Sequence, residues 1–205
     1  MSRGGSFEAA YRSGAPPWDI GRRQPAVARL ERAGEIAHKV LDVGCGTGDN
    51  AIYLARRGHE VLGIDSAPLA IEQAQAKSRA GRWRSKPRFA VHDALELAQV
   101  GDSFGAVIDC GLFHALSDEE RRPYVGGLRS VLEEGGHYFM LCFSEHEPDG
   151  WGPRRIDAAD ITGTFREEDG FEVEAIEETR FETRDGRRGA RAYLARIRRV
   201  EPRRR

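Results

Sequence analysis

The sequence predicts an α/β protein with a doubly wound, mostly parallel sheet of seven strands that ends in an antiparallel C-terminal hairpin. Short apolar segments alternate with amphipathic ones between residues 39 and 143, which is typical of parallel strands joined by helices. Three glycines at positions 44, 46 and 48 separate the first of these strands from the helix after it. Near the C-terminus, two strand-like segments flank Asp185-Gly186, a dipeptide that favours a hairpin turn.

Each element follows from its own local pattern. A short first strand is expected at residues 40–41 with Asp42 at its end, and further strands over residues 60–65, 88–92, 104–110, 137–143, 171–181 and 189–200. Helices are expected over residues 7–12, 26–34, 48–57, 67–79, 117–132 and 157–165. Gly58 is expected to end the helix that follows the glycine turn. Ser66, Ser117 and Asp157 are expected to cap the helices that follow them, and Ser117 has Glu120 three residues later as in a capping box.

The glycine turn indicates a ligand that lies directly against the backbone. Glycine lacks a Cβ atom, so the chain can take unusual backbone angles and approach a ligand closely there. The helix that follows points free N–H groups toward the same place. Asp65 ends the next parallel strand, where its carboxylate can accept hydrogen bonds from both hydroxyls of a ribose. The combination predicts a nucleoside-type ligand.

The spacing of the glycines separates two kinds of nucleoside ligand. Dinucleotide-binding turns have the pattern G-x-G-x-x-G, whereas this chain has G-x-G-x-G preceded by Asp42. A carboxylate at that strand end is unfavourable beside a pyrophosphate and suits a ligand with a positive amino or sulfonium group. An NAD-binding oxidoreductase stays as an alternative because the fold is widely shared.

The turn from Asp42 to Gly48 resembles the first motif, acid-x-G-x-G-x-G, of the Rossmann-like class I S-adenosylmethionine-dependent methyltransferases. Further segments are similar to the thiopurine, halide and thiol methyltransferases and to bacterial enzymes that methylate heterocycles or quinone-like compounds: residues 18–22, 58–65, 108–116 and 152–155. The similarity extends from about Trp18 to Ile197. Plant halide enzymes carry Gly-Pro-Pro-aromatic where this chain has residues 152–155 as Gly-Pro-Arg-Arg, so their acceptor preference is not carried over.

The resemblance implies S-adenosyl-L-methionine as cofactor, S-adenosyl-L-homocysteine as product and a small aromatic or heterocyclic acceptor methylated on S, O or N. The cofactor-binding residues it suggests are Trp18, Asp42, Gly44, Cys45, Gly46, Asp65, Ser66, Asp93, Ala94 and Cys110. In this reading Asp93 accepts a hydrogen bond from the adenine amino group; the alternative is a loop carboxylate or helix cap. Trp18 either lies against the sulfonium or the substrate ring or anchors the N-terminal segment.

Methyl transfer from a sulfonium depends chiefly on alignment, with the acceptor atom held about 3 Å from the methyl carbon. A thiolate or halide needs no base, whereas a phenolic hydroxyl benefits from one. His114, just after the fourth strand, is the first candidate for this base and Tyr11 the second; the alternative for His114 is hydrogen-bonded packing. Phe113, Trp151 and Arg154 are expected to contact the acceptor. Arg154 or Arg155 either orients an anionic acceptor by bidentate contact or lies in solvent.

The composition limits the classes of partner and the cellular location that the sequence predicts. The 205 residues contain 32 Lys and Arg against 33 Asp and Glu, so no overall basic field predicts a nucleic-acid or membrane partner. The chain lacks a membrane-length apolar run and a signal-peptide core, from which a cytoplasmic location is expected. The scattered Cys45, Cys110 and Cys142 predict neither a disulfide framework nor a metal site.

We divide the chain into a segment over residues 1–38 that covers cofactor and substrate, a methyltransferase domain over 39–200 and a basic tail over 201–205. We expect a monomer or homodimer. A rival hypothesis is a methyltransferase-like protein that binds the cofactor for regulation and has no turnover.

Overall fold

The computed structural model describes residues 3–14, 16–83, 85–184 and 189–202. Seven strands form one sheet in the order β3-β2-β1-β4-β5-β7-β6. Neighbouring strands are parallel from β3 to β5, and β7 runs antiparallel to both β5 and β6. The predicted sheet is therefore confirmed. The strands are β1 (Lys39–Val43), β2 (Glu60–Asp65), β3 (Arg88–Val91), β4 (Phe104–Cys110), β5 (Leu132–Phe143), β6 (Phe171–Phe181) and β7 (Ala190–Arg199).

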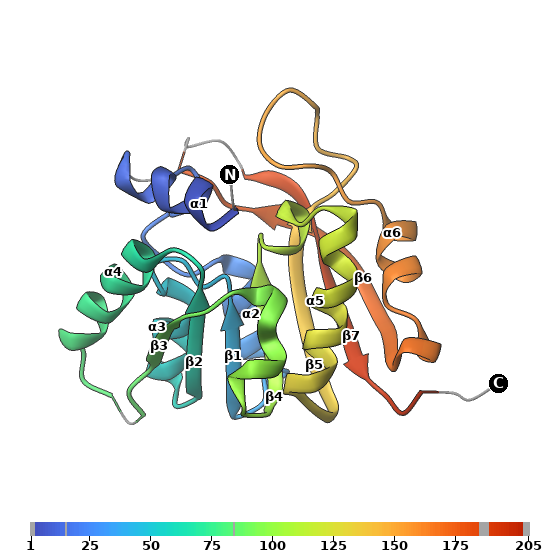
Figure 1. Cartoon of the computed structure of the whole chain (residues 1–205), viewed down its shortest axis with the longest axis horizontal. Coiled ribbons are helices and arrows are strands. Elements are labelled where there is room, and N and C mark those ends of the chain that lie inside the picture. Colours follow the sequence, from blue (N-terminus) through green and yellow to red (C-terminus); the bar gives the residue numbers. More distant parts are fainter. Residues whose placement is uncertain (1–2, 15, 84, 185–188, 203–205) are drawn as a thin grey trace.

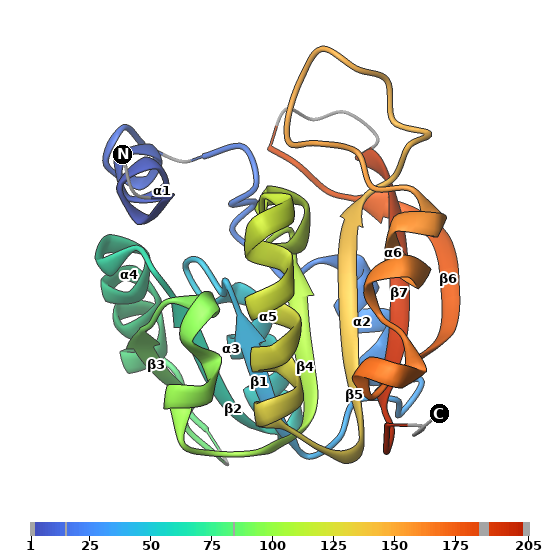
Figure 2. The ribbon, with the colours of Figure 1, turned by 45° about the vertical axis from the view of Figure 1, so that its right-hand side comes forward.

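Helices lie on both faces of the sheet (Figure 1; Figure 2). They are α1 (Arg3–Arg12), α2 (Pro25–Arg32), α3 (Asp49–Arg57), α4 (Pro68–Arg79), α5 (Asp118–Val131) and α6 (Ala158–Thr164), with short 3₁₀ segments η1 (Ala94–Val100), η2 (Phe113–Ala115) and η3 (Glu167–Asp169). Because successive strand side chains point to opposite faces, Ala106 and Ile108 of β4 pack in one core cluster with α2 and α3, and Val107 packs in another with α5 and α6.

Several element boundaries differ from the expectation. The first helix begins at Arg3 rather than residue 7, and β5 begins at Leu132, directly after α5, because Leu132 pairs with Phe104 before a shift in register. Residues 94–100 form η1, a segment to which no regular element was assigned. The expected turn Asp185-Gly186 lies outside the described residues.

The expected helix caps are confirmed at two of three places. Ser117 and Glu120 form the capping box of α5, and Asp157 accepts a hydrogen bond of 2.5 Å from the N–H of Asp160 in α6. The expectation for Ser66 was wrong, because Asp65 instead accepts from the N–H of Ala67, the residue that precedes α4.

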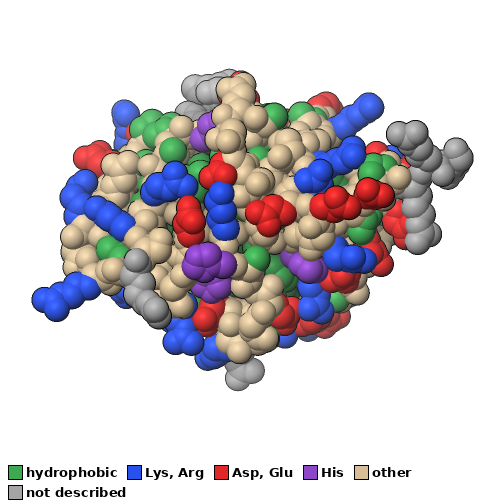
Figure 3. Space-filling model, turned by 90° about the horizontal axis from the view of Figure 1, so that it is seen from below, with side chains coloured by type: hydrophobic (Ala, Val, Ile, Leu, Met, Phe, Trp, Pro, Cys, Tyr) green, Lys and Arg blue, Asp and Glu red, His purple; other side chains and the backbone are tan. Residues whose placement is uncertain are grey.

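Charges of both signs cover the end of the sheet opposite the glycine turn (Figure 3). Lys39 pairs with Asp102 at 2.5 Å, and Arg88 lies 3.7 Å from Glu60. Within the described ranges, this face does not gather a patch of one sign such as a phosphate backbone would attract. No helix among the described residues is long and apolar enough to cross a bilayer.

Candidate functional site

A cavity of about 1010 Å³ lies at the carboxyl ends of the parallel strands. Its walls include the glycine turn, the ends of β2, β3 and β4 and the N-terminal segment from α1 to residue 24. The turn after β4, one side chain of α5, and the ends of β5 and β6 with the segments that follow them complete the lining. The volume lies at the upper end of the range of about 300–1,000 Å³ that is usual for ligand sites. Ligands of doubly wound sheets bind at this edge.

The glycine turn needs glycine for two separate reasons. Gly44, Gly46 and Gly48 have φ angles of 67°, 53° and 81°, a region that side chains other than glycine rarely adopt. A Cβ atom at Gly46 would also lie 2.6 Å from the Tyr11 hydroxyl oxygen. Gly44 and Gly46 therefore line the cavity with backbone atoms alone, and the side chains of Leu112 and Tyr11 pack against them.

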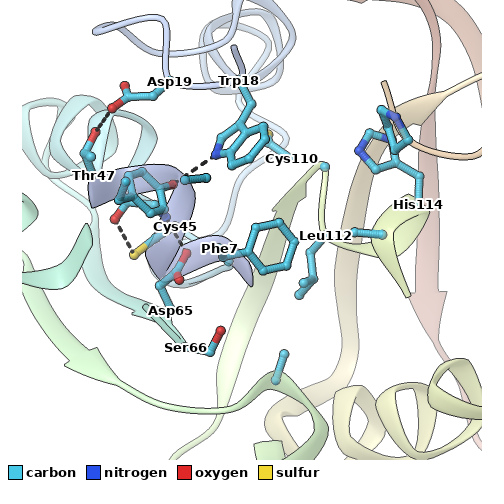
Figure 4. A pocket seen from close by; sticks show the side chains of 18 of the residues that line it. Phe7, Trp18, Asp19, Cys45, Thr47, Asp65, Ser66, Cys110, Leu112 and His114 are labelled. Carbon is cyan, nitrogen blue, oxygen red and sulfur yellow. Dashed lines mark hydrogen bonds between the residues drawn. The ribbon is translucent and has the colours of Figure 1, made fainter. Parts of the chain in front are cut away.

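Asp65 faces the cavity from the end of β2, as predicted (Figure 4). Its Oδ2 accepts a hydrogen bond of 2.9 Å from the N–H of Gly46, and its Oδ1 accepts one of 2.9 Å from the N–H of Ala67. Burial raises the pKa of this carboxyl, and the two backbone donors act in the opposite direction. The carboxylate is thus held in one orientation and joins the glycine turn to the start of α4.

Asp42 does not lie beside the cavity, contrary to the expectation. The side chain is buried beneath the glycine turn, and its Oδ2 accepts a hydrogen bond of 3.1 Å from the N–H of Ala51 in α3. Burial raises the pKa of Asp42 to about 8. It therefore supports the first turn of α3 from below and does not present a carboxylate to a ligand.

The other expected cofactor residues, Trp18, Cys45, Ser66, Asp93, Ala94 and Cys110, all line the cavity. Asp93 also accepts a hydrogen bond of 2.9 Å from the N–H of Leu95 and caps η1, so both interpretations of this residue agree with its position. Burial raises the pKa of the Cys45 and Cys110 thiols. Trp18 and Val91 are the exposed large hydrophobic side chains of the described chain, at 37% and 52%, and both line the cavity.

The N-terminal segment closes one side of the cavity. Glu8 Oε2 accepts a hydrogen bond of 3.0 Å from the N–H of Leu69 in the first turn of α4, which fixes α1 on α4. The indole N–H of Trp18 donates to the Tyr11 hydroxyl over 3.1 Å. Burial and the nearby Asp65 raise the pKa of the Tyr11 phenol. Tyr11 is therefore a neutral phenol and a poor base at neutral pH.

A polar network beside the glycine turn was not predicted. The Thr47 hydroxyl donates to Asp19 Oδ2 over 3.2 Å, and Lys77 Nζ donates to Thr47 and to Asp49 over 2.7 and 2.8 Å. Thr47, Asp19 and Asp49 line the cavity. The segment around Asp19 is part of a motif that resembles the methyltransferases, and this was the available signal for its position.

Aromatic side chains form the opposite end of the cavity. His114, Phe143, Trp151 and Phe181 line it together. The His114 ring meets Phe143 edge-on with 5.1 Å between centroids and lies 5.8 Å from Phe181. Phe143 and Phe181 were not selected from the sequence, although each ends a strand. The sequence pattern does not show which strand ends meet in space.

His114 is held in a defined state. The backbone N–H of Phe143 donates to its Nδ1 over 2.9 Å, so Nδ1 carries a lone pair and the proton of the neutral ring is on Nε2. Burial, with a smaller effect of Arg155, lowers the pKa of His114 to about 3. This geometry opposes the expected role as a general base.

Two residues expected to contact the acceptor lie elsewhere. Phe113 is fully buried in the core under α5, with its ring 5.7 Å from that of Phe165. Arg154 pairs with Asp118 at 2.6 Å and does not line the cavity. Phe113 packs in the core and Arg154 forms an ion pair, so neither side chain reaches the space beside His114.

Asp109 fixes the turn that carries His114. The carboxylate is fully buried and accepts hydrogen bonds from the Tyr138 and Tyr124 hydroxyls over 2.7 and 2.9 Å. It also accepts from the N–H groups of Leu112 and Phe113 over 2.8 and 3.1 Å. The turn after β4 is therefore anchored from below.

Comparison with known proteins finds methyltransferases both among protein families and among individual relatives. Residues 40–136 match the family described as "Methyltransferase domain". The 2-heptyl-1-hydroxyquinolin-4(1H)-one methyltransferase of Mycobacteroides abscessus is 35% identical over 164 residues, which cover 76% of this chain and 72% of that protein.

Two solved structures share the architecture. One, described as "Conversion of a Disulfide Bond into a Thioacetal Group during Echinomycin Biosynthesis", is 32% identical with a TM-score of 0.87 and covers 97% of this chain and 94% of its own. The other is the 1,6-didemethyltoxoflavin-N1-methyltransferase of Burkholderia thailandensis with bound 1,6-didemethyltoxoflavin and S-adenosylhomocysteine. It is 21% identical with a TM-score of 0.73, over 97% of this chain and 87% of that one.

Proposed function

The chain belongs to the S-adenosyl-L-methionine-dependent methyltransferases, and from this premise we propose that it methylates an S, O or N atom of a small aromatic or heterocyclic acceptor. When bound, the cofactor supplies a methyl group already activated on a sulfonium. The contribution of the protein is then to bind both molecules and to align them.

The strand-tip end of the cavity fits the cofactor. Gly44 and Gly46 line the cavity without side chains of their own, and Asp65 offers a fixed carboxylate to ribose hydroxyls. Val91 and Trp18 are exposed apolar surfaces on the same cavity, as expected where a flat base or a sulfonium is covered on binding. Asp93 follows Val91 by two residues and lines the same cavity, and in this proposal it accepts a hydrogen bond from the adenine amino group.

The aromatic end supports the acceptor class. Phe143, Trp151 and Phe181 offer flat apolar surfaces to a planar ring, and His114 adds one polar group among them. The observation that carries the proposal is that the glycine turn and this aromatic wall belong to one cavity of about 1010 Å³. A cofactor and a small second molecule would share it.

The test begins with binding. Isothermal calorimetry of the purified protein is expected to show binding of S-adenosyl-L-homocysteine and none of NAD. Mass spectrometry should then detect methylation within a panel of thiophenols, phenols and hydroxyquinolones. Binding without transfer to any member of the panel would favour a regulatory cofactor-binding protein, and binding of NAD alone would favour an oxidoreductase.

A further inference from the structure

We infer that the acceptor enters the site already ionised and that His114 receives it through a fixed Nε2–H hydrogen-bond donor, without acting as a base. This inference rests on the proposed function and narrows it to acceptors that lose a proton readily in water. Thiols and acidic hydroxy groups on heteroaromatic rings are of this class.

The orientation of the ring is set by the backbone. The N–H of Phe143 points at Nδ1 over 2.9 Å in a buried position, and a donor in that place requires a lone pair on Nδ1. The single proton of the neutral imidazole is then on Nε2. A second proton would have to go to Nδ1, where it would displace the Phe143 hydrogen bond and also charge a ring that is 5% exposed, and both changes are unfavourable.

The surroundings of the ring also disfavour a positive charge. Phe143 of β5 and Phe181 of β6 pack on it with apolar rings. The charged group that acts on it is the Arg155 guanidinium, which lies over the Phe143 ring at 5.4 Å from its centroid and is positive itself. Its influence agrees in direction with burial, which lowers the pKa of His114 to about 3.

The Nε2 atom has no hydrogen-bond partner among the described residues and lies beside Gly111. A Cβ atom at Gly111 would be only 3.2 Å from Nε2, and both residues line the cavity. An N–H donor without a partner in the described part of the chain lies at the aromatic end of the cavity. Such a donor suits an acceptor oxygen or sulfur that carries negative charge.

Two further titratable groups, the thiol of Cys110 and the carboxyl of Glu120, line the cavity. Desolvation of the half-buried Cys110 side chain at the end of β4 raises the pKa of its thiol, so the thiol is neutral. Glu120 of α5 lines the cavity, but its Oε2 accepts the N–H of Ser117 at 2.8 Å in the capping box. Glutamine also serves at this capping position, so Glu120→Gln separates the structural task of Glu120 from basic catalysis.

Methyl transfer to an ionised acceptor needs no base in the site. The acceptor gives its proton to solvent before it binds. Its lone pair then forms the bond to the methyl carbon, while the electrons of the broken carbon–sulfur bond stay on sulfur. One negative and one positive charge disappear together, and Nε2–H helps to hold the acceptor atom in line until they do.

The first experiment uses a series of substituted thiophenols and 1-hydroxyquinolin-4-ones whose pKa values differ. We expect kcat/KM to rise with pH through the pKa of each acceptor and then to level off, so that the midpoint moves with the acceptor. Glu120→Gln should retain this profile. A midpoint common to all acceptors, or a loss of activity in Glu120→Gln alone, would overturn the inference.

A pair of variants tests the donor itself. His114→Asn places an amide oxygen where Nδ1 accepts from Phe143 but removes the Nε2 donor, whereas His114→Gln can extend an amide N–H toward the position of Nε2. We expect kcat/KM to fall roughly ten- to a hundredfold in His114→Asn, the effect of losing a hydrogen bond to a charged group, and to fall less in His114→Gln. The reverse order, with both variants folded by circular dichroism, would contradict the donor role.

A spectroscopic readout does not depend on turnover. Two-bond ¹H–¹⁵N correlation spectra, assigned by comparison with His114→Asn, should show the neutral ring with its proton on Nε2 and no titration between about pH 5 and 9. A proton on Nδ1, or titration in this range, would overturn the inference even if methyl transfer is observed. If no acceptor is methylated while S-adenosyl-L-homocysteine binds, the proposed function fails and the inference fails with it.

Discussion

Asp65 accepts a hydrogen bond of 2.9 Å from the backbone N–H of Gly46, so the carboxylate that ends β2 is joined to the glycine turn that follows β1. The other oxygen of Asp65 accepts from the N–H of Ala67 just before α4. One side chain therefore shapes two walls of the cavity. A role in binding the ribose would add to this role in shaping the turn.

The first prediction concerns that double role. Asp65→Ala removes the acceptor of two backbone N–H groups together with the proposed partner of the ribose. We expect the dissociation constant of S-adenosyl-L-homocysteine to rise roughly a hundredfold, or about 3 kcal/mol, measured by isothermal calorimetry. His114→Ala changes the aromatic end of the cavity and should raise this dissociation constant much less. Equal losses in the two variants would contradict the division of the cavity into a cofactor end and an acceptor end.

A second prediction follows from the buried position of Asp42. In the unfolded chain an aspartate ionises near pH 4, whereas burial raises the pKa of Asp42 in the folded protein to about 8. Between these values the folded state holds more protons than the unfolded state, so this residue lowers stability as pH rises. Asp42→Asn retains an acceptor for the N–H of Ala51 and does not ionise.

Urea unfolding at several pH values measures this effect. The stability of Asp42→Asn relative to the natural protein should increase by about 1 kcal/mol per pH unit between about pH 5 and 8. Asp102→Asn is a suitable control, because the partner Lys39 lowers the pKa of Asp102 and the group is ionised throughout this range. Its effect should be nearly constant with pH. A constant difference for Asp42→Asn as well would mean that Asp42 is ionised in the folded state.

The third prediction tests the anchor of the turn that carries His114. Tyr138→Phe removes a hydrogen bond of 2.7 Å to the buried Asp109, and a hydrogen bond to a charged group contributes about 1.5–3 kcal/mol. We expect a loss of that size in the free energy of unfolding. Tyr53→Phe removes a similar hydrogen bond to Glu31 on a part-buried surface. Its free energy of unfolding should fall by less than about 1 kcal/mol. Similar losses in both variants would show that burial of Asp109 adds nothing.

The elements and the position of the glycine turn beside the cavity could be predicted from the sequence because they depend on local patterns. Alternating apolar segments and the glycine turn determine where β1 and α3 form, and Asp65 ends a strand that must lie beside β1. The direction in which a side chain points could be predicted less well from the sequence. Asp42 was expected at the cavity, but it precedes the turn by two residues and points under it to Ala51.

The aromatic end of the cavity was predicted only in part, because its residues come from segments far apart in the chain. His114 and Trp151 were selected, whereas Phe143 and Phe181 were not. Whether a side chain after a strand faces the cavity depends on how η2 and the segment after β5 turn. Phe113 faces the core one residue before His114 faces the cavity, and no periodic pattern distinguishes them in so short a helix.

The last prediction concerns the attachment of α1 over the cavity. Glu8 accepts from the N–H of Leu69 in the first turn of α4, where free backbone N–H groups and the helix dipole favour a negative charge. This bond joins α1, which carries Tyr11, to a helix that begins beside Asp65. We expect Glu8→Ala to weaken the attachment and to speed the dissociation of S-adenosyl-L-homocysteine by roughly tenfold, measured by stopped-flow fluorescence of the tryptophans.

Arg12→Ala provides the matched control for this variant. It removes the ion pair between Arg12 and Glu8 but leaves the bond from Leu69 to Glu8 in place. The Arg12 side chain is 73% exposed, and exposed ion pairs contribute little, so dissociation should stay close to that of the natural protein. If Glu8→Ala also leaves the rate unchanged, α1 does not control release of the cofactor. If both variants speed release equally, the charge of the helix surface matters rather than the contact with α4.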